Sequence, residues 1–116
     1  MRLARPVYPI TATLKGVEIA RSTRAIKLKE VGRDIYDAVI YFPREDVAMG
    51  QLERISKSTH CPLKGDTEYF DARIAGQHIA EVAWSYDRTL AFARDIEGYI
   101  AFDSRLVQVM EHTVTS

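Results

Sequence analysis

Several features that define common classes of protein are scarce or missing in this sequence. Cys61 is the single cysteine, so the chain cannot form an intrachain disulfide. No apolar run approaches the roughly 20 residues that a membrane span requires. The first residues, Met-Arg-Leu-Ala-Arg-Pro, also lack the apolar core of a secretory signal. These absences predict a cytoplasmic protein without a membrane partner.

The chain also lacks net charge. Its 16 lysines and arginines balance 16 aspartates and glutamates, so no overall field attracts nucleic acid. Basic residues do concentrate between Arg2 and Lys29, but they alternate with apolar residues, which is typical of the solvent-facing side of strands. We therefore expect no nucleic-acid partner.

Length and composition predict one globular domain covering residues 1–116. A chain of 116 residues buries roughly two-thirds of its unfolded surface when it folds. Its 47% hydrophobic and 28% charged content is that of an ordinary globular protein. The sequence shows no internal repeat and no linker that would divide it.

Short β-rich runs separated by turn residues dominate the chain. Residues 10–14 alternate apolar and polar side chains, and Lys15-Gly16 supplies a turn before the next run, at 17–22. Residues 35–42 form the most apolar run, which predicts a central strand ending before Pro43. Residues 67–74 and 78–86 predict a hairpin. We expect a mainly β fold of about eight short, mostly antiparallel strands in a two-sheet or barrel-like arrangement.

One helix is expected near residues 88–97. Asp87 is suited to capping its N-terminus, and Leu90, Ala93 and Ile96 recur at helical spacing. Gly98 then provides a left-handed stop.

The metal-binding residues do not form a recognisable set. A structural zinc site needs about four Cys or His ligands in close pairs, whereas His60, His78 and His112 are scattered around one cysteine. No His-x-x-x-His pair supports a catalytic metal. We predict neither a metal nor another cofactor.

Residues 59–66, Thr-His-Cys-Pro-Leu-Lys-Gly-Asp, concentrate the reactive groups of the chain. Cys61 could act as a nucleophile or serve as a small buried hydrophobe. His60 points to the opposite face of a strand from Cys61, so the two do not form a dyad. Lys64 could form a Schiff base, bind an anion or stay exposed in a turn. Lowering a lysine pKa from about 10.4 to about 7 requires roughly 4–5 kcal/mol, which favours anion binding over the Schiff base.

Aromatic residues could complete a site around this motif. Trp84 and Tyr86 are two residues apart and share one face of a strand, and Tyr69 lies on the strand paired with theirs. Such residues often form core instead. If these rings open toward Lys64, they would wall a small pocket with a few polar anchors.

The order of several motifs resembles the domain of unknown function 427 family, over about residues 17–109. The most specific feature is Thr-x-Cys-Pro-x-Lys-Gly followed by Ala-Trp-x-Tyr. The motifs that carry the resemblance are Tyr41-Phe42-Pro43, Asp46-Val47, the motif at 59–66, Tyr69, Ala83-Trp84-Ser85-Tyr86 and Ile100-Ala101-Phe102.

The resemblance implies a β-tent-like domain, an architecture shared with methionine sulfoxide reductase B. Relatives with that fold carry zinc on paired cysteines, which this chain lacks, so the metal does not carry over. One label attached to the family suggests a nucleotidyltransferase. The sequence does not support this activity, because it has no Gly-Ser followed by paired aspartates. Leu63 replaces a tyrosine common in the family, which suggests a packing position.

These observations predict a small-molecule-binding domain for an anionic or nucleotide-like metabolite. Its expected ligand-binding residues are His60, Cys61, Lys64, Tyr69, Trp84 and Tyr86. One alternative is an enzyme that uses Cys61 or Lys64 as nucleophile or acid/base. Another is a structural interaction domain that uses a sheet edge, and a homodimer stays open.

Overall fold

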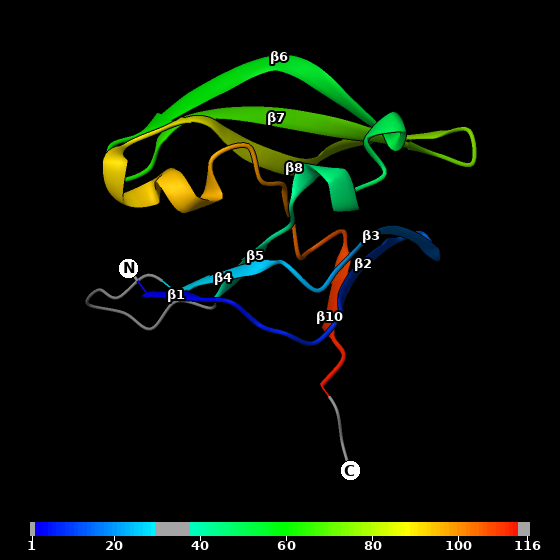
Figure 1. Cartoon of the computed structure of the whole chain (residues 1–116). Coiled ribbons are helices and arrows are strands. Elements are labelled where there is room, and N and C mark those ends of the chain that lie inside the picture. Colours follow the sequence, from blue (N-terminus) through cyan, green and yellow to red (C-terminus); the bar gives the residue numbers. More distant parts are fainter. Residues whose placement is uncertain (1, 30–37, 114–116) are drawn as a thin grey trace.

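The computed structural model describes residues 2–29 and 38–113 (Figure 1). In these two ranges the chain forms ten strands and three short 3₁₀ helices. They are β1 (Arg2–Ala4), β2 (Ile10–Leu14), β3 (Val17–Ser22), β4 (Ile26–Lys29), β5 (Val39–Tyr41), η1 (Arg44–Asp46), η2 (Met49–Gln51), β6 (Leu52–Cys61), β7 (Gly65–Ile74), β8 (Gln77–Thr89), η3 (Ala91–Ile96), β9 (Ala101–Phe102) and β10 (Gln108–Glu111).

The strands form three antiparallel sheets, with the orders β1-β4-β5, β10-β2-β3 and β6-β7-β8-β9. The sheet containing β6, β7 and β8 lies at the top of Figure 1, and the two smaller sheets lie below it. The prediction of a mainly β, antiparallel fold is confirmed. The expected eight strands in a two-sheet or barrel-like arrangement are not matched, because the described residues form ten strands that divide among three sheets and close no barrel.

Two hairpins follow directly from their turn residues. Lys15 and Gly16 have φ values of 52° and 78°, and Ala75 and Gly76 have values of 50° and 79°. Two successive residues with positive φ make the tight turn whose twist matches that of antiparallel strands. The predicted pairings of β2 with β3 and of β7 with β8 are confirmed.

The expected helix near 88–97 is largely wrong. Strand β8 continues through Asp87 to Thr89, and only the six-residue 3₁₀ helix η3 follows, with no side-chain hydrogen bond at its N-cap, Leu90. Asp87 therefore lies in a strand and caps nothing. Gly98 does adopt the left-handed conformation, at φ 78°, so the predicted stop is correct.

The most apolar run is not central in its sheet. Strand β5 lies at the edge of the order β1-β4-β5. Tyr41 belongs to one buried cluster and Phe42 to another, so neighbouring residues are buried on both sides. The part of this run before Ala38, and the turn expected at Gly32-Arg33-Asp34, lie outside the described residues.

Isolated bridges join the sheets within the described ranges. Phe42 and Ile100 exchange two backbone hydrogen bonds of 2.8 Å. Ala20 makes a second bridge to Val47, next to η1. The larger buried cluster combines side chains of β2, β3, β7 and β8, and the smaller one combines side chains of β4, β5, β8 and η3. The first bridge thus joins the residue after β5 to the residue before β9 of the large sheet, and the second joins β3 to the segment between η1 and η2.

Strand β6 forms an outer edge of the large sheet (Figure 1). It carries the charged residues Glu53, Arg54 and Lys57, and its register with β7 shifts between Arg54 and Ser58. Charged side chains and bulges both hinder pairing between exposed edges. The edge is therefore built to resist indiscriminate strand pairing.

Candidate functional site

The motif at 59–66 forms the connection between β6 and β7. The Lys64 N–H donates to the Cys61 carbonyl at 3.3 Å, which closes a turn over Pro62 and Leu63. Proline presets the backbone for the second position of such a turn. We expected Leu63 to occupy a packing position. This expectation is wrong, because the residue is 55% exposed.

Gly65 lets β7 approach β8 very closely. Its φ is +123°, and a Cβ atom at this position would lie 1.9 Å from the backbone oxygen of Arg88. Only glycine tolerates both this conformation and this approach. Two residues after Arg88, the Leu90 N–H donates to the Lys64 carbonyl at 2.9 Å. The glycine and this hydrogen bond together fix the backbone at Lys64.

Lys64 is buried although it carries an amine. The residue is 8% exposed, and its Nζ lies 5.6 Å from the ring centroid of Tyr86, within the range of a cation–π interaction. Burial disfavours the charged form and lowers the pKa of the Lys64 amine. The alternative of an exposed turn lysine is therefore wrong.

Two buried tyrosines, Tyr41 and Tyr86, pack against each other beside Lys64. The rings of Tyr41 and Tyr86 have centroids 6.4 Å apart. Burial raises the pKa of both phenols, and the side chains of Trp84 and Thr67 counter part of this rise as hydrogen-bond partners of Tyr41 and Tyr86 respectively. Cys61 and Trp84 pack partly buried against the same cluster. Cys61, Lys64, Trp84 and Tyr86 therefore converge.

The side chains of His60 and Tyr69 each bond to a residue across the pair of strands β6 and β7. The His60 ring is exposed on strand β6, where its Nδ1 lies 2.8 Å from an Asp66 carboxylate oxygen. Tyr69 pairs in register with Trp84, but its hydroxyl hydrogen bonds Thr59 at 2.8 Å. Lys57 lies over its ring. Of the six predicted residues, His60 and Tyr69 are thus the two whose side chains already contact other polar or charged side chains near the sheet edge.

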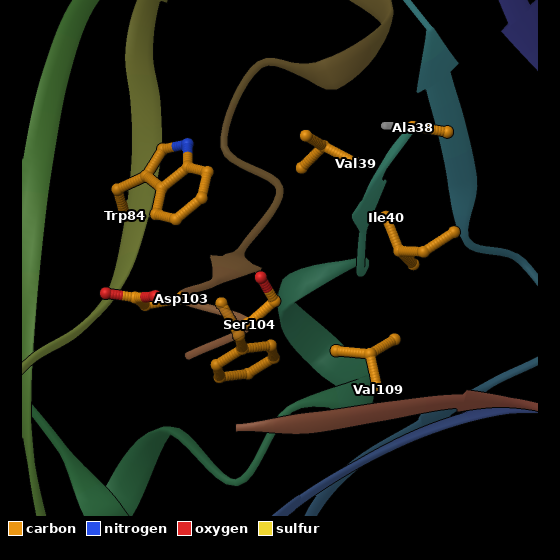
Figure 2. Close-up of a pocket in the computed structure, with 8 residues that line it drawn as sticks. Ala38, Val39, Ile40, Trp84, Asp103, Ser104 and Val109 are labelled. Carbon is orange, nitrogen blue, oxygen red and sulfur yellow. The ribbon is translucent and has the colours of Figure 1, made fainter. Parts of the chain in front are cut away.

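A cavity of about 190 Å³ opens beside Trp84 (Figure 2). The indole ring faces Val39 and Ile40 across this space, and Ser104 lies between them at its lower side. The lining residues are Ala38, Val39, Ile40, Trp84, Phe102, Asp103, Ser104 and Val109. Trp84 is thus the one predicted residue in the wall of this cavity.

Sequence reasoning missed a charged network on the large sheet. Arg44 donates from Nη2 to Glu68 at 2.7 Å and to Ser85 at 3.3 Å, and from Nε to the Gly98 carbonyl at 3.0 Å. Arg54 forms a second ion pair with Glu68, at 3.0 Å. This network ties η1 to β7, β8 and the segment after η3.

A signal for the network was present in the sequence. Glu68 has the same alternation as Phe70, Ala72 and Ile74, which are buried on β7. A carboxylate in phase with core residues needs a buried partner. The partner, Arg44, could not be identified because it comes from a different element.

The described ranges contain neither a cluster of metal ligands nor a membrane-spanning helix. No three His, Cys, Asp or Glu side chains there gather closely enough to hold a metal ion. No helix in residues 2–29 or 38–113 is long and apolar enough to cross a membrane.

Comparison with known protein families places the residues described above within a known family. A family model described as a domain of unknown function, DUF427, matches residues 3–113. A comparison with curated proteins found no match. The family match extends further toward both ends than the motifs alone indicate. It includes every residue of the two buried clusters and every residue that lines the cavity.

Proposed function

The chain belongs to the domain of unknown function 427 family, and we propose that it is a small-molecule-binding domain whose ligand occupies the cavity beside Trp84. The observation that carries this proposal is a preformed space of about 190 Å³ with mainly apolar walls and two polar residues, Asp103 and Ser104. Small-molecule sites commonly combine these properties.

The size of the cavity limits the ligand. Drug-sized ligands occupy pockets of about 300–1,000 Å³, whereas an engineered apolar cavity of about 150 Å³ binds benzene in another protein. At about 190 Å³, this cavity fits a molecule with one ring. A nucleotide-like metabolite could place only its base here, and its anionic group would have to extend outside the cavity.

Trp84 offers a direct test because it is the only tryptophan in the chain. We expect a ligand to change the Trp84 fluorescence and to raise the unfolding temperature when a library of small metabolites is titrated. At a ligand concentration of 100 times Kd, the stabilisation is about 2.7 kcal/mol. No change in either signal across the library would contradict the proposal.

A pair of valine substitutions provides the control. Val109→Phe places a larger side chain in the cavity wall and should remove both responses. Val7→Phe makes the same change at a residue that is 88% exposed and should leave them intact.

An enzyme remains the second candidate, because Lys64 is buried against Tyr86 and close to the cluster that holds Cys61. A lysine with a lowered pKa holds more neutral, nucleophilic amine at a given pH than an ordinary lysine. Either the amine or the thiol could then attack an electrophilic substrate.

The reactivity of Lys64 tests this candidate. In competitive acetylation followed by mass spectrometry, we expect the reactivity of Lys64 to rise at lower pH than that of a free-lysine standard, because its pKa is lowered. The exposed Lys15 serves as a reference for reagent access. An unshifted profile for Lys64, together with a Cys61 that alkylates no faster than a free thiol, would leave the enzyme candidate without support.

For the finer fold assignment, we infer the β-tent-like arrangement that the family resemblance implies. Its support is that two small sheets lie below one larger sheet (Figure 1). A cytoplasmic location, the absence of a nucleic-acid partner and an interaction role for the sheet edge stay predictions from the sequence.

A further inference from the structure

The apolar part of the cavity wall is suited to one flat ring. Trp84 from β8 presents its indole on one side, and Val39 and Ile40 of β5 lie on the other (Figure 2). Phe102 and Val109 complete the apolar surface. An aromatic ring between an indole and aliphatic side chains gains burial of both its faces and a favourable aromatic contact.

The polar part of the wall consists of one carboxylate, which only accepts hydrogen bonds, and one hydroxyl, which can accept or donate. Asp103 contributes a carboxylate, and the hydroxyl of Ser104 points into the space between Trp84 and Val39 (Figure 2). Hydrogen bonds from Arg105 lower the pKa of Asp103, which is therefore ionised at neutral pH. The charged group in the wall of this cavity is thus negative.

The pairing of Asp103 leaves it able to accept a bond from a ligand. Arg105 donates to it from the backbone N–H at 2.9 Å, from Nε at 3.1 Å and from Nη2 at 2.8 Å. The Arg105 side chain is 87% exposed and that of Asp103 is 17% exposed. An ionised carboxylate offers about four acceptor positions and Arg105 uses three of them, so Asp103 can accept from one further donor while it stays paired.

We propose that the cavity beside Trp84 takes a single-ring arylalkylamine, with its ring against Trp84 and its ammonium group donating to Asp103 and Ser104. This inference rests on the binding function proposed above. A carboxylate on the same ring would bring acceptors against the Asp103 acceptors, and a ring without a donor would leave the acceptors partly desolvated and unpaired. The acceptors in the wall thus disfavour the anionic class expected from Lys64.

Three probes of similar shape test the inference: benzylamine, toluene and benzoate. Titration against the Trp84 fluorescence should show benzylamine binding about tenfold or more tightly than toluene, because its ammonium gains a hydrogen bond to a charged group that toluene cannot make. Benzoate should bind most weakly. A benzoate or toluene affinity equal to or above that of benzylamine would overturn the inference.

Substitution of the carboxylate isolates its role. Asp103→Asn should reduce the preference for benzylamine over toluene to near unity, while Asp95→Asn, at an exposed aspartate that pairs with Arg5, should leave the preference unchanged. Ser104→Ala should reduce it in part and serves if Asp103→Asn does not fold. An unchanged preference in both cavity variants would overturn the inference.

The same titrations separate this inference from the binding function itself. If other metabolites shift Trp84 and lose that effect in Val109→Phe, but benzylamine does not bind, the binding function stands and the ligand class is wrong. If neither the probes nor the metabolite library changes Trp84, both are wrong.

Discussion

Replacing Arg44 with alanine is expected to lower the free energy of unfolding by about 3 kcal/mol. The substitution removes the donor to three acceptors on different segments: Glu68, Ser85 and the Gly98 carbonyl. Glu68 is 8% exposed and Ser85 is fully buried, so water cannot readily replace the lost bonds. Urea denaturation of the purified variant measures the change.

Arg54→Ala is the matched control, because Arg54 pairs with the same Glu68 carboxylate. Its side chain is 63% exposed, and an exposed ion pair contributes less than about 1 kcal/mol. Arg44→Lys should recover only part of the loss, since an ammonium cannot reproduce the planar guanidinium geometry. Equal losses in Arg44→Ala and Arg54→Ala would show that Arg44 does not join the segments as described.

Gly65→Ala is expected to destabilise the protein by about 3 kcal/mol or more. The added Cβ would lie 1.9 Å from the Arg88 oxygen, and the φ of +123° is unfavourable for alanine. Strands β7 and β8 must then separate where they hold the Lys64 backbone. Denaturation measures the loss, and the acetylation profile of Lys64 should move toward that of free lysine as the site opens.

Gly50→Ala makes the same chemical change without the clash. A Cβ at Gly50 has no neighbouring heavy atom within 4 Å, so the expected change in unfolding free energy is less than about 1 kcal/mol. Similar losses in the two variants would contradict the role given to the close approach at Gly65.

Local sequence signals predicted the hairpins well because the turn residues themselves determine them. Lys15-Gly16 and Ala75-Gly76 adopt positive φ values that select tight turns. The helix near 88–97 failed for an equally local reason. Leu90, Ala93 and Ile96 are three residues apart, which fits the three-residue repeat of a 3₁₀ helix as well as an α-helix. The spacing therefore could not distinguish the two types of helix, although Ala93 and Ile96 are both buried in the structure.

The strand order and the cavity could not be predicted from local patterns, because both depend on contacts between residues that are far apart in the sequence. High apolar content predicts a central strand over 35–42, but β5 is an edge strand whose residues pack against two buried clusters. The cavity combines residues from Ala38 to Val109. Trp84 could be singled out by its motif, whereas Asp103 and Ser104 carried no signal of their own.

The bridge between Phe42 and Ile100 couples the cavity to the core of the domain. The two residues exchange two backbone hydrogen bonds, and the cavity residues Ile40 and Phe102 each lie two positions away along the chain. Phe42 and Ile100 are both fully buried, so we expect this joint to open only when the surrounding core opens with it. The amide hydrogens of Phe42 and Ile100 should then exchange with solvent about as slowly as the most protected amides of the domain.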